Sequence, residues 1–303
     1  MDEAELLTGP ARLRRVTKSR VILVVLVALA VAAATLWPRT AHHARRAVAA
    51  AATSAPETFF ALLLDRAVEE SPEQQQQDYG KADAITTGLN GPWIARHTTP
   101  CRSVMTHDRT SFTTKGLVTD LAASPDGHWL AYGRVGCSSD ALVVRNIQSG
   151  AEQVWPSDSR AISSLSWSSD NHDLVFQLSP TCCGFGGPTP HQLDLNHPPV
   201  SIVILPPIAT ALDQKWSLHD PTYAGSRLLL LADRFEGEQH AVVDVAGHVV
   251  AHLQEEANGL DADSSGQHLL VTLYGGSDGT SSLLAFTGAD FQILGRGYTS
   301  ARW

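Results

Sequence analysis

The C-terminal two thirds of the chain alternate short apolar runs with polar turns rich in Gly, Asp, Asn and Ser. Runs this short, bounded by turn residues, are typical of β-strands rather than helices. The pattern therefore predicts an all-β domain. Its clearest predicted strands are residues 103–106, 111–114, 141–146, 153–155, 241–245, 248–253, 282–286 and 291–294.

The predicted strands belong to an internal repeat. Residues 121–132 recur 44 positions later as residues 165–176, with Leu, Ser, Asp, Leu and an aromatic residue in register. A third copy covers residues 260–271, and residues 223–231 form a degenerate copy with a shortened turn. Four short strands per 40–45 residues is the period of a β-propeller blade. The residues that define the repeat turn are Ser124, Pro125, Asp126, Gly127, Ser168, Asp170, Asn171, Ser265 and Gly266.

The first copy, Ser124-Pro-Asp-Gly127 between two apolar strands, resembles the TolB-type propeller repeat, a relative of WD repeats. The resemblance covers about residues 115–303 in about four copies. It implies a propeller fold and leaves the ligand open. The other copies depart from Ser-Pro-Asp-Gly, so the blade count stays open between about five, which we favour, and four or six.

The last residues of the chain predict how the ring closes. Tyr298–Trp303 matches residues 163–167, the innermost strand of a blade. A chain that ends one strand into a blade needs an earlier segment to complete that blade. Closure of this kind removes the exposed sheet edges, and we expect residues 98–115 to supply the missing strands.

A separate element precedes the repeats. Residues 21–37 carry no charge and would span about 25 Å as a helix, at the short end for a bilayer. Basic residues are denser before this segment than after it, which predicts a cytoplasmic N-terminus, a single-pass signal-anchor at residues 21–38 and an exported body. The alternative is a signal peptide cleaved before Thr35, which would release the body as a secreted or periplasmic protein.

The segment between the anchor and the repeats has helical features. Ser54-Ala-Pro-Glu57 has the spacing of a capping box, and the apolar residues that follow recur at helical spacing. We therefore expect a short stalk helix over about residues 56–70. The predicted organisation is a basic cytoplasmic N-terminus (1–20), the anchor (21–38), a linker with the stalk helix (39–97) and an extracytoplasmic propeller (98–303).

The charge distribution supports this topology and excludes one class of partner. Eight of the 22 basic and three of the 31 acidic residues lie in residues 1–53. The body, residues 54–303, keeps 14 basic and 28 acidic residues, a net charge of −14. Such a body lacks the basic surface that nucleic-acid binding needs. None of the asparagines lies in an N-glycosylation sequon, which favours a bacterial inner-membrane protein.

Three motifs have possible chemistry, and for each the structural interpretation is stronger. Residues 275–279 match the hydrolase elbow G-x-S-x-G, but no histidine follows them, so a Gly-rich hairpin is favoured. Residues 261–266 resemble the start of a calcium loop, but the position of the bidentate Glu holds Thr272. His191, Asp194 and His197 would alternate faces along a strand, so surface hydrogen bonding is favoured over a metal site. We therefore assign no catalytic, cofactor-binding or metal-binding residue.

The four cysteines all follow the predicted anchor: Cys101, Cys137, Cys182 and Cys183. In an oxidising compartment they can pair in three ways, and we favour Cys101 with Cys137. The neighbouring Cys182 and Cys183 could instead form a vicinal disulfide or hold a soft metal. They lie in residues 179–200, the longest departure from the repeat and a candidate region for a specific function.

The function that these features favour is binding rather than catalysis. A rigid ring that displays loops and a channel is suited to docking a protein or peptide on one face. A propeller hydrolase or lactonase with a site in the channel is the alternative, and a redox or metal sensor at Cys182 and Cys183 is another.

Overall fold

The computed structural model describes residues 58–303 except 64, 71–75, 137–139, 181–186, 213–214, 235, 264, 275–280 and 287–290. The predicted cytoplasmic segment, the anchor at residues 21–38 and residues 39–57 of the predicted linker lie outside the described residues. In the described part, no helix has the length and apolar character needed to cross a bilayer. The anchor therefore stays a prediction.

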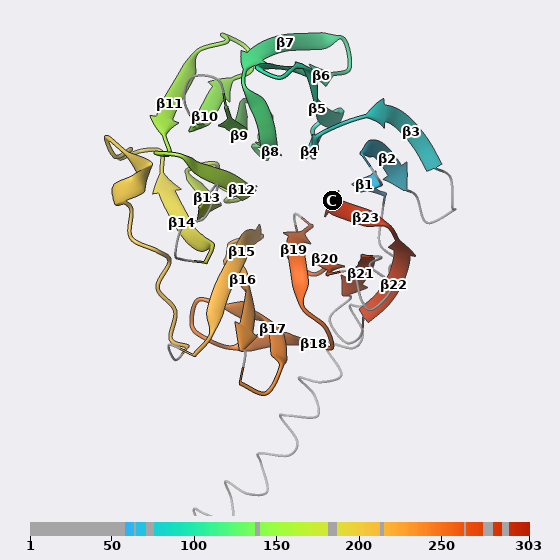
Figure 1. The fold of residues 1–303 in the computed structure, drawn as a ribbon, viewed down its shortest axis with the longest axis vertical. Helices are drawn as coiled ribbons and strands as arrows, with labels where there is room; N and C mark the ends of the chain where they lie inside the picture. Colours follow the sequence, from blue (N-terminus) through green and yellow to red (C-terminus); the bar gives the residue numbers. More distant parts are fainter. Residues whose placement is uncertain are drawn as a thin grey trace, which may run out of the picture. The chain divides into compact units, whose positions relative to one another are not determined.

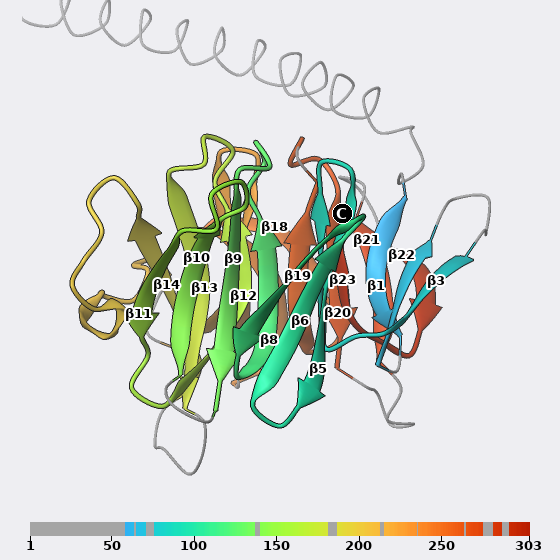
Figure 2. The ribbon, with the colours of Figure 1, turned by 90° about the horizontal axis from the view of Figure 1, so that it is seen from above.

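Six antiparallel sheets are arranged as the blades of a ring around a central channel (Figure 1). Figure 2 shows the ring from the side, with the strands running between its two faces. We number the blades in chain order. Blade 1 holds β1 (Phe59–Leu63), β2 (Arg66–Glu70), β3 (Gln76–Lys81) and, innermost, β23 (Tyr298–Arg302); blade 2 holds β4 (Ala84–Gly88), β5 (Gly91–Thr99), β6 (Arg102–His107) and β7 (Thr110–Lys115).

The other four blades start from their innermost strand. Blade 4 has three strands where the others have four, and its last connection contains a short 3-10 helix, η1 (Ile202–Ile204). Blade 3 holds β8 (Leu117–Ala123), β9 (Trp129–Val135), β10 (Ala141–Asn146) and β11 (Glu152–Pro156); blade 4 holds β12 (Arg160–Trp167), β13 (Asp173–Pro180) and β14 (Thr189–Asp194). Blade 5 holds β15 (Ser217–Ala224), β16 (Arg227–Arg234), β17 (Gln239–Asp244) and β18 (Val249–Leu253); blade 6 holds β19 (Ala257–Ala262), β20 (Leu269–Leu273), β21 (Ser282–Phe286) and β22 (Phe291–Arg296).

The all-β propeller prediction is confirmed, but the favoured count of five blades is wrong. The sixth blade comes from the segment in which we expected a stalk helix. Residues 59–63 and 66–70 are strands joined at Asp65, whose positive φ of 73° turns the chain. Both faces of a blade pack against neighbouring blades, so apolar residues there do not alternate strictly with polar ones. A short apolar run of this kind does not distinguish a strand from a helix.

The two ends of the propeller meet in blade 1. β1 pairs with β23 in antiparallel register, with Ala61 opposite Ala301 and Phe60 opposite Arg302. The prediction that an N-terminal segment completes the blade of the last strand is therefore confirmed, but the position predicted for that segment is wrong. Residues 103–106 and 111–114, expected to close the ring, belong to β6 and β7 of blade 2.

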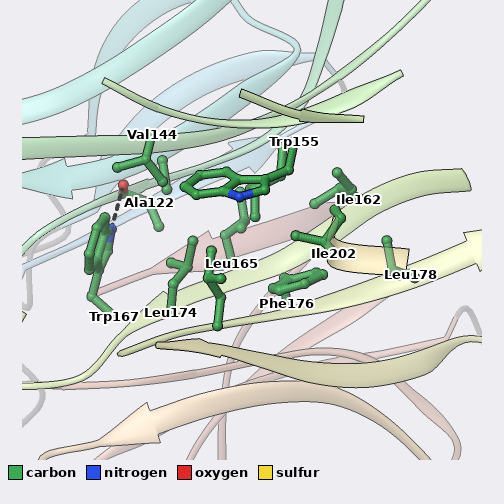
Figure 3. Packing of buried hydrophobic residues seen from close by; sticks show 13 residues of the cluster. Ala122, Val144, Trp155, Ile162, Leu165, Trp167, Leu174, Phe176, Leu178 and Ile202 are labelled. Atoms are coloured by element: carbon green, nitrogen blue, oxygen red, sulfur yellow. Dashed lines mark hydrogen bonds between the residues drawn. The ribbon is translucent and has the colours of Figure 1, made fainter. Parts of the chain in front are cut away.

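The core lies between adjacent blades rather than at one centre. Between blades 3 and 4, Trp167, Leu174 and Phe176 pack with Val144 and other apolar side chains (Figure 3). The indole Nε1 of Trp167 donates to the carbonyl oxygen of Ala122 on the previous blade at 3.0 Å. Each blade is thus held by apolar burial on both faces, and the innermost strands are tied to one another.

Candidate functional site

An ion cluster crosses the channel between the innermost strands. Arg302 on β23 donates from Nη2 to both carboxylate oxygens of Asp120 on β8, at 2.9 and 3.0 Å. Its Nη1 lies 3.6 Å from Oδ1 of Asp261 on β19. The cluster joins blades 1, 3 and 6 across the ring.

Burial and pairing decide the charge of this cluster. Burial disfavours the charged form of Arg302, but the negative charges of Asp120 and Asp261 outweigh it and raise the pKa of the guanidinium. Burial raises the pKa of Asp261 despite the nearby arginine. Asp120 also accepts from the backbone N–H groups of Leu121 and Leu165, both at 2.8 Å. The arginine therefore neutralises carboxylates that would otherwise be buried without a counter-ion.

Bulges in the inner strands position these polar groups. The pairing registers of β8, β12, β15 and β19 with their neighbours each shift once. Ser164 and Asp220, within two of these shifts, have positive φ of 54° and 44°, and the Ser164 hydroxyl donates to the Asp220 carboxylate. Bulges re-aim side chains next to functional sites, and here they direct polar groups towards neighbouring inner strands.

A second buried network lies in blade 5 beside Asp220. His219 Nδ1 is 2.8 Å from Asp220 Oδ2, and its Nε2 is 2.6 Å from Asp233 Oδ2. His240 Nδ1 contacts the other oxygen of Asp233 at 2.7 Å. Burial disfavours the charged imidazole, but the hydrogen bonds and charges of Asp220 and Asp233 outweigh it and raise the pKa of His219 to about 9.

The turns between the first two strands of blades 3, 4 and 6 contain the predicted repeat-turn residues. The Ser124 hydroxyl donates to Asp126 at 2.5 Å and accepts from the Trp129 N–H at 2.9 Å. Ser168 and Asp170 make the same hydroxyl–carboxylate bond at 2.6 Å. In blade 6, Asp263 occupies the first position and accepts from the Ser265 hydroxyl at 2.6 Å.

These turns line a cavity of about 760 Å³ at one mouth of the channel. We call this cavity the funnel, and the side of the ring that it opens on the repeat-turn face. All six blades contribute, and Asp261 and Arg302 are among the lining residues, so the ion cluster lies at the inner end of the funnel. Its aromatic side chains are Trp167, Tyr223, His268 and Trp303, and its other polar side chains include Thr58, Thr86, Thr87, Ser124, Ser166, Ser169, Asp263, Ser265 and Gln267.

Acidic side chains held by the turns distinguish the repeat-turn face. Asp126 accepts from the His128 N–H at 3.0 Å, and Asp263 is 2.8 Å from His268 Nδ1. Partial burial opposes ionisation, but hydrogen bonds from neighbouring hydroxyl, backbone and imidazole groups lower the pKa of both carboxyls. The face therefore carries fixed negative charge at neutral pH.

The remaining sequence motifs have structural roles where they are described. Asp261 of the supposed calcium loop binds Arg302, and Asp263 holds the turn, so the two carboxylates serve different contacts. His191 is buried against Phe176 and contacts Thr189. Asp194 Oδ2 and His197 Nδ1 meet at 2.9 Å because β14 ends at Asp194 and the chain turns, which corrects the expectation that they face apart.

Other motifs lie partly outside the described residues. These are the Gly-rich segment at residues 275–280 and the cysteines Cys137, Cys182 and Cys183, so their predicted roles stay predictions. Cys101 lies in the turn between β5 and β6. Within the described part of the chain, no group of three or more His, Cys, Asp or Glu side chains is arranged to hold a metal ion.

Sequence reasoning missed the central arginine although a signal was present. Aligning Trp303 with Trp167 places Arg302 opposite Ser166 of the repeat. A charged residue in place of a small polar one, on the strand nearest the channel, indicates a counter-ion inside the ring.

Comparison with known proteins supports the fold alone. No family model matches the chain, and no curated protein matches its sequence. TolB from Acinetobacter baumannii is similar in structure, with a TM-score of 0.54 and 12% identity over 81% of this chain and 64% of that chain. A structure assigned as TolB from Agrobacterium tumefaciens has a TM-score of 0.55 and 11% identity over 79% and 88% of the two chains.

A third neighbour is a chain of the nidogen/laminin complex, with a TM-score of 0.55 and 9% identity over 81% of this chain and 97% of that chain. The fold and the closed ring together define the class of protein. The chain is a six-bladed β-propeller whose structural neighbours include TolB-type propellers.

Proposed function

We propose that this protein is a membrane-tethered, extracytoplasmic scaffold that binds a protein or peptide at the repeat-turn face. The funnel is the observation that carries this proposal. It is large enough for several side chains, and every blade of a rigid ring contributes to it. Its aromatic side chains and its many hydroxyl and carboxylate groups suit contact with a polypeptide.

The structural neighbours favour a protein partner over a small molecule. One of them was solved as a complex between two proteins, nidogen and laminin. The neighbours share little sequence with this chain, so they support the type of scaffold and not a particular ligand.

Site-specific photo-cross-linking tests the face. Benzoylphenylalanine at Gln267, an exposed residue of the funnel, should capture a defined partner segment in the native envelope. The same probe at Asp158, exposed on the connection between β11 and β12 at the opposite end of β12, is the control. Equal capture at both positions, or capture at neither, would contradict binding at the repeat-turn face.

The tether is proposed from the sequence: an anchor at residues 21–38 would tie the propeller to a bacterial inner membrane. We expect the full-length protein to resist extraction from the membrane by carbonate. We also expect its body to be digested by protease added from outside the cytoplasm. Release of the body into the soluble fraction would favour the cleaved signal peptide.

A channel enzyme is the second candidate, because carboxylates converge on the channel. Asp120 and Asp261 contact Arg302, and the charge of Asp220 also raises the pKa of this arginine. Asp120 and Asp220 make several further hydrogen bonds. Carboxylates held in this way are poorly suited to act as a free acid and base. Hydrolysis of lactone or glycoside substrates that is lost in an Asp261→Asn variant would favour this candidate over binding.

A redox or metal sensor at Cys182 and Cys183 is the remaining alternative. It predicts that partner capture at Gln267 depends on the oxidation state of these cysteines. Unchanged capture in a variant with both cysteines replaced by serine would exclude it.

A further inference from the structure

In the described residues, blade 4 has no regular fourth strand, and a proline-rich connection runs along its outer edge. Residues 206–208 follow β14 only briefly, through a single bridge between His191 and Pro207 and a 2.8 Å bond from Ile208 N to Pro190 O. Prolines have no N–H to donate, so this segment cannot form a complete ladder. The outer edge of blade 4 is therefore shaped by an irregular connection.

This connection forms one wall of a second cavity, of about 930 Å³, which we call the groove. Leu205 to Ala209 line one side of it. The turns of blade 5 line the other side, with Tyr223, Leu228 and Val245. The groove is thus a feature of blades 4 and 5 and not of the repeat as a whole.

Exposed apolar side chains occur on the two segments that form the groove. Val245 lines the groove and is 40% exposed. Val200 and Ile204 on the proline-rich connection are 97% and 72% exposed, and Val249 on β18 is 44% exposed, but these three do not line the groove. Exposed apolar side chains beside a groove are typical of a surface that a partner covers.

The groove also carries negative charge. Asp194 and Asp244 line it together with one arginine, Arg227, and with His197, so carboxylates outnumber the arginine two to one. The imidazole of His197 and the N–H of Asn196 bond Asp194, while His248 and Arg227 bond Asp244. These carboxylates belong to a body that carries twice as many acidic as basic residues. A partner with basic side chains therefore complements the groove electrostatically.

The groove adjoins the funnel at Tyr223, whose side chain lines both cavities. A segment bound in the funnel can pass over Tyr223 and remain in contact with the protein. We propose that the groove holds an extended segment of the partner, with apolar side chains between the two walls and a lysine or arginine at Asp194 and Asp244. This proposal rests on the proposed binding function and names the chemistry of the partner.

Cross-linking at two positions separates this proposal from the proposed function. Benzoylphenylalanine at Val245 reports on the groove, and the probe at Gln267 reports on the funnel. Val154 on the outer strand of blade 3 is a matched control, since it is a valine with 43% exposure and does not line either cavity. Mass spectrometry of the cross-linked peptide should place the probes at 245 and 267 on neighbouring stretches of one partner segment.

The outcomes distinguish the two proposals. Capture at 267, with capture at 245 no stronger than at 154, overturns the groove and leaves the funnel. Capture at neither position overturns both. Capture at position 245 of a segment that has no basic residues, or of a second copy of this chain, overturns the proposed occupant of the groove.

A synthetic peptide with the sequence of the captured segment tests the charge. Its binding to the full chain, followed by fluorescence anisotropy, should weaken at least tenfold when its lysine or arginine is changed to glutamate. An Asp194→Asn variant should weaken binding of the original peptide severalfold, while an Asp65→Asn variant, changed at an exposed turn of blade 1, should not. If the unmodified protein binds the original peptide and the glutamate peptide with equal affinity, the proposal is wrong.

Discussion

Arg302 on the last strand of the ring holds Asp120, which lies 182 positions earlier in the chain, through both carboxylate oxygens. The contact spans the channel, and both side chains are almost fully buried. Loss of the arginine would leave buried carboxylates unpaired, which costs far more than the loss of a surface ion pair.

We therefore expect Arg302→Met to lower the free energy of unfolding by about 3–5 kcal/mol. Urea unfolding followed by circular dichroism measures it. Lys81→Ala is the control, because Lys81 and Asp65 are 3.9 Å apart with side chains 82% and 64% exposed. The control should change stability by less than about 0.5 kcal/mol. A loss of under about 1 kcal/mol in the arginine variant would contradict the role of the cluster.

Two repeat-turn glycines should respond differently to alanine. Gly127 and Gly266 have positive φ of 70° and 69°, so either substitution strains the backbone by about 1 kcal/mol. A Cβ at Gly127 would meet the Leu89 side chain at 2.5 Å, and that side chain is exposed and can move. A Cβ at Gly266 would meet the carbonyl oxygen of Ala224 at 2.6 Å, which belongs to the backbone of the previous blade, blade 5.

We expect Gly266→Ala to cost at least about 1 kcal/mol more than Gly127→Ala, because a clash with backbone cannot be relieved by a rotamer change. Thermal unfolding of the two variants side by side checks this order. Equal losses would show that the contact with Ala224 relaxes easily.

The His219 network predicts a loss of stability at alkaline pH. Its folded-state pKa of about 9 lies above the ordinary value of 6.5. The stabilisation is therefore complete below about pH 6.5 and is lost as the pH rises from 6.5 through 9, because the folded state must then give up a proton that it binds tightly. Urea unfolding at pH 6.5, 8 and 9 should show the decline.

A His219→Gln variant should be less stable at pH 6.5 and should show a flatter decline up to pH 9. His172→Gln is a matched control, since the His172 side chain is 58% exposed and lies 3.8 Å from its carboxylate partner. The control should keep the slope of the native protein. An unchanged slope in the His219 variant would exclude this network as the cause.

The cysteine pairing can be tested with the ring geometry as a guide. The carbonyl oxygen of Cys101 accepts from Gly116 N at 2.8 Å, and a Cβ on Gly116 would lie 3.5 Å from the oxygen of Gly136. Cys137 follows directly in the sequence, which supports pairing with Cys101. Peptide mapping without reduction should recover a Cys101–Cys137 cross-link, and Cys101→Ser should cost about 2–4 kcal/mol. A cross-link from Cys101 to Cys182 or Cys183 would exclude this connectivity.

The sequence predicted those parts of the fold that depend on local chemistry. The turns are visible because Asp, Asn and Gly at fixed positions supply the hydrogen bonds and backbone angles that a tight turn needs. Strands such as 141–146 and 282–286 match the structure at both ends. The blade count failed because β1 and β2 are not joined by a repeat turn of this type, and because the continuous apolar run of β1 does not alternate as a half-buried strand would.

The site was harder to predict because it depends on contacts between distant segments. Asp120 and Arg302 meet only after blades 4, 5 and 6 have been placed between them, and the bulge at Asp220 leaves no trace in the local pattern. The groove was partly anticipated, since residues 179–200 were identified as a departure from the repeat. The structure places its wall slightly later, around Leu205 to Ala209.

Blade 1, which contains both the first and the last strand of the propeller, has a consequence for the order of folding. β1, β2 and β3 are made first, yet β1 finds its inner neighbour only when residues 298–302 have been made. The Tyr298 hydroxyl bonds to Glu70, 228 positions away. Because long-range contacts form slowly and late, the ring cannot be completed one blade at a time as the polypeptide emerges. The ring therefore stays open, with the inner edge of β1 unpaired, until its last strand arrives.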